Sequence, residues 1–381
     1  MRILLSAGEV SGDQHGAALL GALAERVSGL EAFGLAGDRC AARGMRLLAH
    51  QKELAIIGVV EALGKIRFAH RLMRDLTREA VASRVDAAVL IDSPDFHLPL
   101  ARRLAKAGVP VVFYVSPQVW AWRSGRARTI ARLGRGVLTL FRFEKRWYDG
   151  RGLGERVTWV GHPLVDEARR ELATPALPPP PGLRRVVLMP GSRAGEVRSL
   201  LPILRDAVAL LEARRPDLDV VLVKADSVPD DLLRRIAGGS LDRWRVVSGP
   251  HLSLLAASDV LIVASGTATV EGLLAGIPMV VVYRVAAISY LLGKLLVKVP
   301  SVAMANILSD PGDGSRAVPE LIEGAATPER VAAEVERFLD DPERAAEARR
   351  RLAARRAELG DPGAPARTTQ ALLALLGRRG A

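Results

Sequence analysis

The chain is poor in cysteine and has no long apolar run. Its only cysteine, Cys40, cannot form a disulfide within the chain and excludes a cysteine-based metal cluster, which is typical of a reducing compartment. No run approaches the roughly 18 apolar residues of a membrane-spanning helix. The apolar run at 3–5 is too short for a signal peptide, and Glu9 and Asp13 follow it closely. We therefore expect a cytosolic protein.

Aromatic residues make up only 4% of the chain, although its net charge is +12. A nucleic-acid binder of this charge would gather its basic residues in one patch interleaved with aromatic side chains. Here the basic residues are dispersed, so we expect no nucleic-acid partner. An anionic membrane surface and phosphorylated substrates remain as explanations of the positive charge.

The length of 381 residues suits two domains of about 150 to 200 residues each. The segment TPALPPPPG at 174–182 has five prolines in nine residues and is the best candidate for a stiff linker. We expect an N-terminal domain at 1–172, which binds the acceptor, and a C-terminal domain at 183–345. The helical tail at 346–381 is expected to pack back on the N-terminal domain or on a partner subunit.

The N-terminal half opens with a buried strand at Arg2–Ala7, a glycine-containing turn, and a helix from about Gln14 to Arg26. This order predicts a doubly wound α/β domain. The turn lacks the GxGxxG spacing, so a dinucleotide site is not indicated. Glu9 and Asp13 in the turn either bind substrate hydroxyls or cap the helix.

Two aspartates follow the strand at Val85–Ile91. Open parallel sheets place their ligands at the carboxyl ends of strands, and a carboxylate held there can act as general base for a sugar hydroxyl. Asp92 is the candidate base, with a plain turn residue as the alternative. Asp95 either contacts the acceptor or caps the following helix.

Polar and aromatic residues also follow the strands at Val109–Val115 and Val157–Val160. Gln118 and Trp120 lie in a turn that forms either a ligand wall or a buried loop. His162 either faces the substrate or makes a structural hydrogen bond. These three residues are therefore further candidates for acceptor contacts.

Residues 59–78 combine apolar residues at helical spacing with basic residues between them. A basic amphipathic helix of this kind lies on an anionic bilayer, or packs on the sheet with a solvated basic face. The apolar segment 288–299 likewise forms a core helix or a second lipid-contacting surface. The candidate membrane contacts are Ile66, Arg67, Arg71, Leu72 and Arg74.

The C-terminal half restarts with a strand at Val186–Met189 and another glycine-containing turn. Backbone N–H groups at Gly191 and Ser192 can bind phosphate oxygens, and Arg193 adds the fixed positive charge that a diphosphate leaving group needs. This turn is therefore a candidate diphosphate site.

A strand, a tight turn, a helix and a second strand follow one another between Val260 and Tyr283. The helix N-terminus offers unpaired N–H groups and a favourable dipole to a phosphate. Glu271, about one turn into the helix, can accept hydrogen bonds from the two hydroxyls of a ribose. The alternative is that these residues only cap the helix. Two such domains imply a ligand cleft between them, and the candidate nucleotide contacts in this turn are Ser265, Gly266 and Thr267.

Eight motifs in the chain keep a fixed order: AGEVSGD at 7–13, GVVEALG at 58–64, IDSPDF at 91–96, YVSPQVWAWR at 114–123, FEK at 143–145, GHPLVD at 161–166, PGSRAGEV at 190–197 and ASGTATVE at 264–271. With these motifs the chain resembles the lipid-A-disaccharide synthase family along nearly its whole length. Eight ordered matches make a chance resemblance improbable.

The resemblance implies a GT-B fold, in which two doubly wound Rossmann-like domains face each other across a cleft. It implies an inverting glycosyltransferase that uses neither metal nor cofactor. The implied substrates are UDP-2,3-diacylglucosamine and 2,3-diacylglucosamine 1-phosphate, which give a β-1′,6-linked disaccharide and UDP. Because both substrates carry acyl chains, a peripheral protein at the cytosolic face of the inner membrane is expected. A homodimer through C-terminal segments is a further expectation.

The resemblance also implies residue roles. The aspartate that matches Asp92 takes the proton from the acceptor 6-hydroxyl, and the arginine that matches Arg193 acts through the UDP diphosphate. Glu9 is expected beside them in the catalytic group. The family cleft contains the residues that match Glu9, Ser11 and Asn306.

Two motifs depart from the family pattern. Asp-Phe-His at 95–97 replaces the commoner Asp-Phe-Asn, which puts acceptor contacts in question. Met-Ala-Asn at 304–306 replaces the commoner Leu-Pro-Asn, which weakens the role of Asn306. A peptidoglycan-type glycosyltransferase or a UDP-sugar 2-epimerase would share ASGTATVE, but we would not expect either to share IDSPDF together with YVSPQVWAWR.

Overall fold

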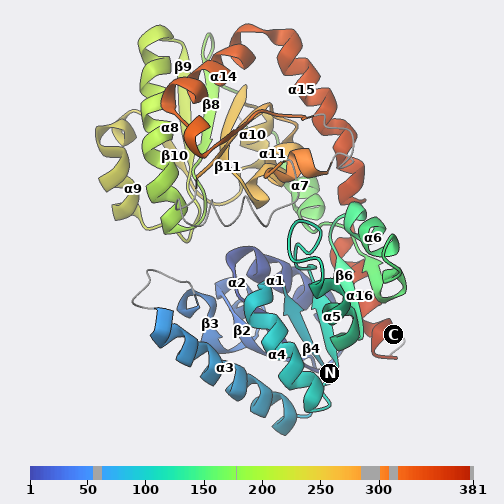
Figure 1. The fold of residues 1–381 in the computed structure, drawn as a ribbon. Helices are drawn as coiled ribbons and strands as arrows, with labels where there is room; N and C mark the ends of the chain where they lie inside the picture. The colour runs from blue at the N-terminus through green and yellow to red at the C-terminus, as the bar shows by residue number, and fades with distance from the viewer. Residues whose placement is uncertain (55–61, 177, 285–300, 309–315, 378–381) are drawn as a thin grey trace. The chain divides into compact units, whose positions relative to one another are not determined.

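Two compact units make up the structure of this chain, which is a computed structural model (Figure 1). The first unit comprises Met1–Pro163 and Leu359–Ala381, and the second comprises Leu164–Glu358. Each unit contains one parallel sheet with helices on its faces. The structure describes residues 1–54, 62–176, 178–284, 301–308 and 316–377.

Seven parallel strands form the sheet of the first unit: β1 (Arg2–Ala7), β2 (Glu31–Ala36), β3 (Arg46–His50), β4 (Ala87–Ile91), β5 (Val111–Tyr114), β6 (Gly136–Thr139) and β7 (Val157–Trp159). Their order is β3-β2-β1-β4-β5-β6-β7. Strand β4, AAVLI, is buried along its whole length, as expected for an apolar run in a sheet covered on both faces. The strand order reverses between β1 and β4, where open α/β sheets bind ligands.

Helices cover both faces of this sheet: α1 (Val10–Ala24), α2 (Asp38–Ala41), α3 (Ala62–Ala82), α4 (Pro94–Lys106), α5 (Arg126–Leu133), α6 (Arg142–Asp149) and α16 (Ala364–Leu375), with 3-10 turns at Gln51–Glu53 and Gly154–Arg156. One core lies beneath α3, α4 and α5 and contains Leu76, Leu104 and Ile130. The opposite core lies beneath α1, α2 and α16 and contains Leu19 and Leu372. The C-terminal helix α16 therefore packs on the first unit.

Six parallel strands form the sheet of the second unit: β8 (Arg184–Met189), β9 (Leu218–Val223), β10 (Arg245–Val247), β11 (Val260–Ala264), β12 (Met279–Tyr283) and β13 (Glu320–Ile322). Their order is β10-β9-β8-β11-β12-β13, so the strand order reverses between β8 and β11. The carboxyl ends of β8 and β11 are therefore the expected ligand position in this unit.

The helices of the second unit are α7 (Leu164–Leu172), α8 (Ala194–Arg214), α9 (Asp230–Ala237), α10 (Leu252–Ala256), α11 (Thr267–Ala275), α13 (Met304–Ile307), α14 (Pro328–Asp340) and α15 (Pro342–Arg355), with 3-10 turns at Gly238–Asp242, Glu323–Ala325 and Arg356–Leu359. Leu201 and Leu204 of α8 and Val335 of α14 are buried in the core on one face of the sheet. Helices α7, α10 and α11 contact one another.

Two boundaries differ from those expected from the sequence. Helix α1 begins at Val10 and not near Gln14, because Glu9 already adopts the extended backbone of an N-cap residue. Helix α7 belongs to the second unit, since its Glu171 carboxylate accepts hydrogen bonds from the backbone N–H groups of His251 and Leu252 at the start of α10. The change of unit therefore falls after Pro163 and precedes the proline-rich segment.

The two segments with predicted membrane contacts are covered to different extents: 288–299 is wholly outside the described residues, and 59–78 is described from residue 62. The first four residues of GVVEALG likewise lie outside the described residues. Within the part of the chain that the structure describes, no helix combines the length and the apolar character that crossing a bilayer requires.

Candidate active site

The first part of the candidate site lies at the carboxyl ends of β1 and β4, which pair directly in the sheet. Asp92 follows β4, and β1 leads through Gly8 to Glu9. Both acids are half-buried. A Cβ atom added at Gly8 would lie 2.6 Å from Ser93 Oγ, so glycine allows the two loops to approach closely. The fold thus places at neighbouring strand ends two acids that are 83 residues apart in the sequence.

The two aspartates of the IDSPDF motif have different surroundings. The Asp95 side chain is 70% exposed and forms an ion pair with Arg126 at 2.8 Å, with Arg123 at 3.5 Å. It does not cap α4, which has no side-chain cap. Asp92 lies closer to the strand end and is half-buried. Of the two, Asp92 is therefore the better candidate for a base, because it lies at the strand end where open parallel sheets bind ligands.

Asp13 has a structural role. Its carboxylate accepts hydrogen bonds from the backbone N–H groups of Gly37 at 2.8 Å, Arg39 at 3.0 Å and Cys40 at 3.1 Å. Its side chain is only 3% exposed. These contacts satisfy the N-terminus of α2, so we remove Asp13 from the expected acceptor contacts. Ser11 lies in the first turn of α1 and is half-buried.

Glu144 is a buried acid near Asp92 that the sequence did not single out. Its carboxylate accepts hydrogen bonds from the backbone N–H of Phe141 at 3.2 Å and from Nε1 of Trp120 at 3.3 Å. Burial raises the pKa of Glu144 to about 8 against these hydrogen bonds, and the charge of Asp92 adds to the rise. Its only sequence signal was the FEK motif, because a glutamate in the first turn of a helix resembles an ordinary cap.

Trp120 and Gln118 occupy the loop after β5 in different ways. Trp120 packs edge-on against Phe143 with ring centroids 5.0 Å apart, whereas the Gln118 side chain is exposed. The Trp120 side chain is therefore half-buried, and its hydrogen bond to Glu144 also fixes its position.

His162 is enclosed by protein and does not face solvent. Its side chain is 2% exposed, and its ring lies 5.4 Å from the ring of His15. Burial and the neighbouring His15 hold the pKa of His162 well below its usual range. Burial also lowers the pKa of His15 to about 4. Both rings are therefore neutral at pH 7, and His162 is a core residue where we had expected an acceptor contact.

The second part of the candidate site begins in the turn between β8 and α8. Here the Glu196 carboxylate accepts hydrogen bonds from the backbone N–H groups of Ser192 at 3.1 Å and Arg193 at 3.2 Å. Its other oxygen lies 3.2 Å from Arg193 Nη1, and the Arg193 side chain is 60% exposed. Two N–H groups and the guanidinium of this turn thus already bind a carboxylate of the chain itself, that of Glu196. Gly191 is required because a Cβ there would lie 2.5 Å from Glu196.

The turn between β11 and α11 is open. Its N-cap residue is Gly266, with φ of 137°, and no side chain caps the helix. The Ser265 hydroxyl donates to the Val302 carbonyl at 2.8 Å, so neither Ser265 nor Thr267 acts as the cap that was the alternative reading. Among the described residues, nothing beyond the adjoining chain lies within 4 Å of a Cβ added at Gly266. Gly266 is exposed, and among the described residues no side chain caps the start of α11.

Glu271 in α11 is paired with His251 at the start of α10. The two side chains approach to 3.4 Å, and each is 17% exposed. Burial lowers the pKa of His251, but the hydrogen bond and charge of Glu271 outweigh it and raise this pKa to about 9. His251 Nδ1 lies 2.8 Å from the Gly249 carbonyl oxygen. His251 is therefore cationic at pH 7 and holds the Glu271 carboxylate in place.

Asn306 has no hydrogen-bonding capacity left for a substrate. Its Nδ2 donates to the Val318 carbonyl at 3.0 Å and to the Glu320 carboxylate at 2.8 Å. Its Oδ1 accepts from the backbone N–H groups of Ala317 at 2.7 Å and Val318 at 3.1 Å. These bonds use both donors and both lone pairs of an asparagine amide. We therefore remove Asn306 from the expected nucleotide contacts, because it ties α13 to the chain before β13.

Helix α3 presents a basic face to solvent. The exposed arginines Arg67, Arg71 and Arg74 follow helical spacing, and Ile66 beside them is 54% exposed. Leu72 is only 6% exposed and lies in the core with the other apolar residues of this helix. The prediction that Leu72 contacts a membrane is therefore wrong in this structure, because the apolar stripe of the helix packs on the sheet.

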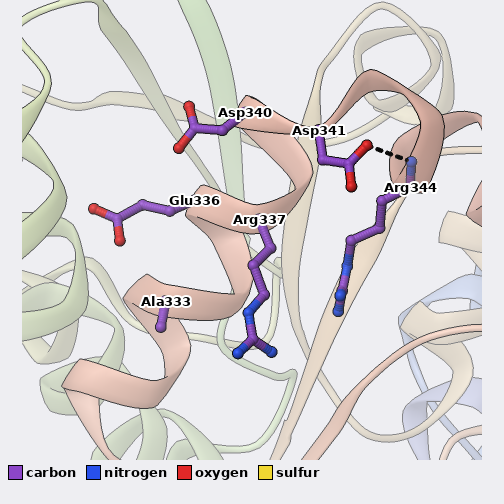
Figure 2. A pocket seen from close by; sticks show the side chains of 6 residues that line it. All are labelled: Ala333, Glu336, Arg337, Asp340, Asp341 and Arg344. Carbon is purple, nitrogen blue, oxygen red and sulfur yellow. Dashed lines mark hydrogen bonds between the residues drawn. The ribbon is translucent and has the colours of Figure 1, made fainter.

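An open crevice of about 470 Å³ lies at the junction of α14 and α15 (Figure 2). Its charged residues already have partners: Glu336 pairs with Arg214, and Arg344 with Glu334. Within the described ranges, no group of three His, Cys, Asp or Glu side chains is arranged to hold a metal ion. The residues that line the crevice are Ala333, Glu336, Arg337, Asp340, Asp341 and Arg344.

Comparison with known proteins agrees with this arrangement. The lipid-A-disaccharide synthetase family model matches residues 3–375. The lipid-A-disaccharide synthase of Syntrophus aciditrophicus (strain SB) is 38% identical over 379 residues, which span 98% of this chain and 97% of that protein.

Solved structures share the fold at much lower identity. The calicheamicin glycosyltransferase CalG4 has a TM-score of 0.63 at 16% identity, over 99% of this chain and 98% of that chain. The UDP-GlcNAc 2-epimerase from Neisseria meningitidis has a TM-score of 0.66 at 11% identity, over 98% and 100%. These likenesses show the GT-B class of two parallel-sheet α/β domains and nothing finer. The sequence match shows more, and by it this chain belongs to the lipid-A-disaccharide synthetase family.

Proposed function

We propose that this chain transfers 2,3-diacylglucosamine from UDP to the 6-hydroxyl of 2,3-diacylglucosamine 1-phosphate. The products are a β-1′,6-linked disaccharide 1-phosphate, the lipid A disaccharide, and UDP. Family membership supports this activity. The structural observation that carries it is the position of Asp92, a half-buried carboxylate at the end of β4 where the strand order reverses.

The reaction we propose is a single displacement at C1 of the donor sugar. The acceptor O6 forms the new bond to C1 while the bond from C1 to the UDP oxygen breaks, which inverts the configuration at C1. The Asp92 carboxylate takes the proton of the O6 hydroxyl, and UDP leaves with the bonding electron pair. A positioned base contributes about 10²-fold to 10⁴-fold to such a step. In our proposal Glu9, at the neighbouring strand end, binds an acceptor hydroxyl.

The second unit supplies the charges that the leaving group needs. In our proposal the diphosphate binds the exposed Arg193 guanidinium together with N–H groups of the turn Gly191–Arg193 and of the α11 N-terminus. A diphosphate dianion is attracted to both by charge and by the helix dipole. The Glu271 carboxylate, held by His251 at 3.4 Å, accepts hydrogen bonds from the ribose hydroxyls.

The test of this function is UDP release by the purified protein. The donor UDP-2,3-diacylglucosamine is supplied with and without 2,3-diacylglucosamine 1-phosphate. We expect UDP release only with the acceptor, together with a phosphorylated disaccharide. UDP binding without acceptor-dependent release would contradict the proposal, and an epimerised UDP-sugar formed without acceptor would replace it with 2-epimerase chemistry.

We also propose that the basic face of α3 lies on an anionic bilayer at the cytosolic side of the inner membrane. Each arginine near such a surface contributes about 1 kcal/mol, and exposed Ile66 adds an apolar contact. Replacing Arg67, Arg71 and Arg74 by Ser should therefore weaken binding to vesicles that contain phosphatidylserine by about 100-fold. The matched control is Arg349, Arg350 and Arg351 to Ser, an equal loss of charge on α15. Equal vesicle binding by the two triple variants would refute the α3 surface.

A further inference from the structure

The backbone at the candidate base has an unusual conformation. Asp92 and the following Ser93 both lie in the left-handed region, with φ of 52° and 41°. Residues other than glycine seldom adopt this conformation, although aspartate tolerates it better than most. Two such residues in succession persist only where the surrounding structure holds them. Something must therefore hold the chain at Asp92.

The side chain of His97, in the first turn of α4, provides this hold. Its Nδ1 lies 2.6 Å from the carbonyl oxygen of Asp92, and its Nε2 lies 2.8 Å from Oγ of Ser6 on β1. Its backbone N–H donates to the Ser93 carbonyl at 2.9 Å. One buried ring thus ties the turn after β4 to the neighbouring strand β1.

The partners of His97 determine where its proton lies. A carbonyl oxygen can only accept a hydrogen bond, so Nδ1 carries the proton and donates it to Asp92. Nε2 then has a free lone pair, and the Ser6 hydroxyl donates to it. Burial lowers the pKa of His97 to about 4, although the bond to Asp92 opposes this shift, so the ring is neutral at pH 7. The ring is therefore held in one tautomer and one orientation.

We propose that His97 is a positioning residue for Asp92, because it holds the Asp92 carbonyl and with it the left-handed backbone that aims the carboxylate. The proposal rests on the proposed function, in which Asp92 is the base. A role in packing alone requires only the shape of the ring. The positioning role requires a hydrogen-bond donor at the place of Nδ1.

Two substitutions at His97 separate these roles. His97→Asn keeps a donor, because its amide nitrogen stands close to the place of Nδ1, whereas His97→Leu fills the space without a donor. Since a misplacement of about 1 Å can cost about 100-fold in rate, we expect His97→Leu to lower kcat by about 10-fold to 100-fold. In the same series His97→Asn should stay within about fivefold of the wild type, and the KM values within about threefold. His15→Asn, which alters another buried neutral histidine in the same unit, should leave kcat unchanged.

Two kinetic outcomes would overturn the proposal. One is a wild-type kcat in His97→Leu, and the other is an equal loss in His97→Asn and His97→Leu. If His97→Leu does not fold, Ser6→Ala takes its place, and the loss of the hydrogen bond that anchors the ring to β1 should lower kcat by severalfold. Asp92→Asn separates the role of His97 from the role of Asp92 as base, since normal turnover in that variant would overturn the proposed function itself.

A spectroscopic measurement tests the hold on Asp92 without any turnover. Nitrogen-15 NMR of histidine-labelled wild-type protein should show one ring, assigned by its loss in His97→Asn, as the Nδ1–H tautomer from pH 5 to pH 8. In Ser6→Ala this ring should keep the Nδ1–H tautomer, because the Asp92 carbonyl can still only accept a hydrogen bond. An Nε2–H tautomer in the wild type, or titration of the ring within this range, would overturn the proposal even if the transferase activity is found.

Discussion

The strand ends of the two units carry the two halves of the proposed chemistry, and they are built differently. After β4 in the first unit the residues with positive φ are Asp92 and Ser93, each at a cost of roughly 1–2 kcal/mol for a residue other than glycine. After β8 and β11 in the second unit the residues with positive φ are Gly191 and Gly266, for which a positive φ is nearly free of cost. The comparison teaches that the backbone after β4 is held in one conformation, which suits proton transfer by a positioned base. The glycine turns after β8 and β11 carry no such strain, which suits the binding of a flexible diphosphate.

The largest effect should come from removing the carboxylate at the fixed strand end. Asp92→Asn should lower kcat by about 100-fold or more, because the amide cannot take the acceptor proton. The affinity for UDP, measured by calorimetry, should not change, because UDP binding is assigned to the second unit. The matched control is Asp95→Asn, three residues away and ion-paired at the surface. If both variants lose activity equally, the distinction between the two aspartates is wrong.

The next effect tests the anion site of the second unit. Arg193→Ala should weaken UDP binding by about tenfold, a modest value because the guanidinium is 60% exposed and well solvated. Arg198→Ala removes an exposed arginine one turn further along α8 and should leave UDP binding unchanged. Equal UDP affinities for Arg193→Ala and Arg198→Ala would contradict the proposed diphosphate site, because the Arg193 guanidinium would then not bind UDP.

The buried Glu144 near Asp92 should make the free energy of unfolding depend on pH, and this tests the comparison further. Its pKa is raised to about 8 in the folded protein, above the ordinary value of 4.5, so the folded state retains a proton that the unfolded state releases. The wild type therefore loses stability as the pH rises from about 4.5 to 8, by linkage. Glu144→Gln lacks this loss, and its free energy of unfolding should rise relative to the wild type by at least about 1 kcal/mol from pH 5 to pH 8.

Urea unfolding at pH 5, 6.5 and 8 measures this difference. The buried histidines titrate in both proteins and cancel in the comparison. Glu155→Gln, at an exposed position, is the control and should run parallel to the wild type. If the free energies of unfolding of Glu144→Gln and the wild type also change in parallel with pH, Glu144 is ionised throughout this range. The comparison between the two units would then lose its buried neutral acid.

The smallest effect concerns the anion already bound at the second strand end. The Glu196 carboxylate occupies the N–H groups of Ser192 and Arg193, which are the donors proposed for the diphosphate. Glu196→Gln removes a negative charge next to this site and should tighten UDP binding by about threefold, since like charges repel. Calorimetry measures the affinity, and weaker binding in this variant would mean that Glu196 shapes the turn for UDP.

Much of this arrangement could be predicted from local sequence. An apolar run followed by polar residues marks the carboxyl end of a buried strand, and parallel strands gather those ends at one edge of the sheet. For this reason the sequence correctly predicts that Asp92, Arg193 and the turn at Ser265–Thr267 follow the ends of buried strands. The turn residues need no distant information, because the helix that follows fixes their N–H groups.

The errors arose where the partner of a side chain is distant in sequence. The Asn306 amide is used completely by groups more than 10 residues away, at Ala317, Val318 and Glu320. Asp13 similarly satisfies backbone groups more than 20 residues away, at Gly37 and Cys40. Leu72 shared a helical pattern with the arginines, and only packing shows which face of the helix meets the sheet. Sequence pattern alone does not reveal how completely a polar group is satisfied.

The most direct test of the account is the configuration of the new glycosidic bond made by the wild-type protein. Proton NMR of the purified product gives this configuration from the coupling constant of the anomeric proton. Because one displacement by O6, with Asp92 as base, inverts C1 of an α-linked UDP-sugar, we predict a β-linked disaccharide that retains the 1-phosphate. An α-linked product would contradict this account, because retention requires a second displacement or a nucleophile other than the acceptor.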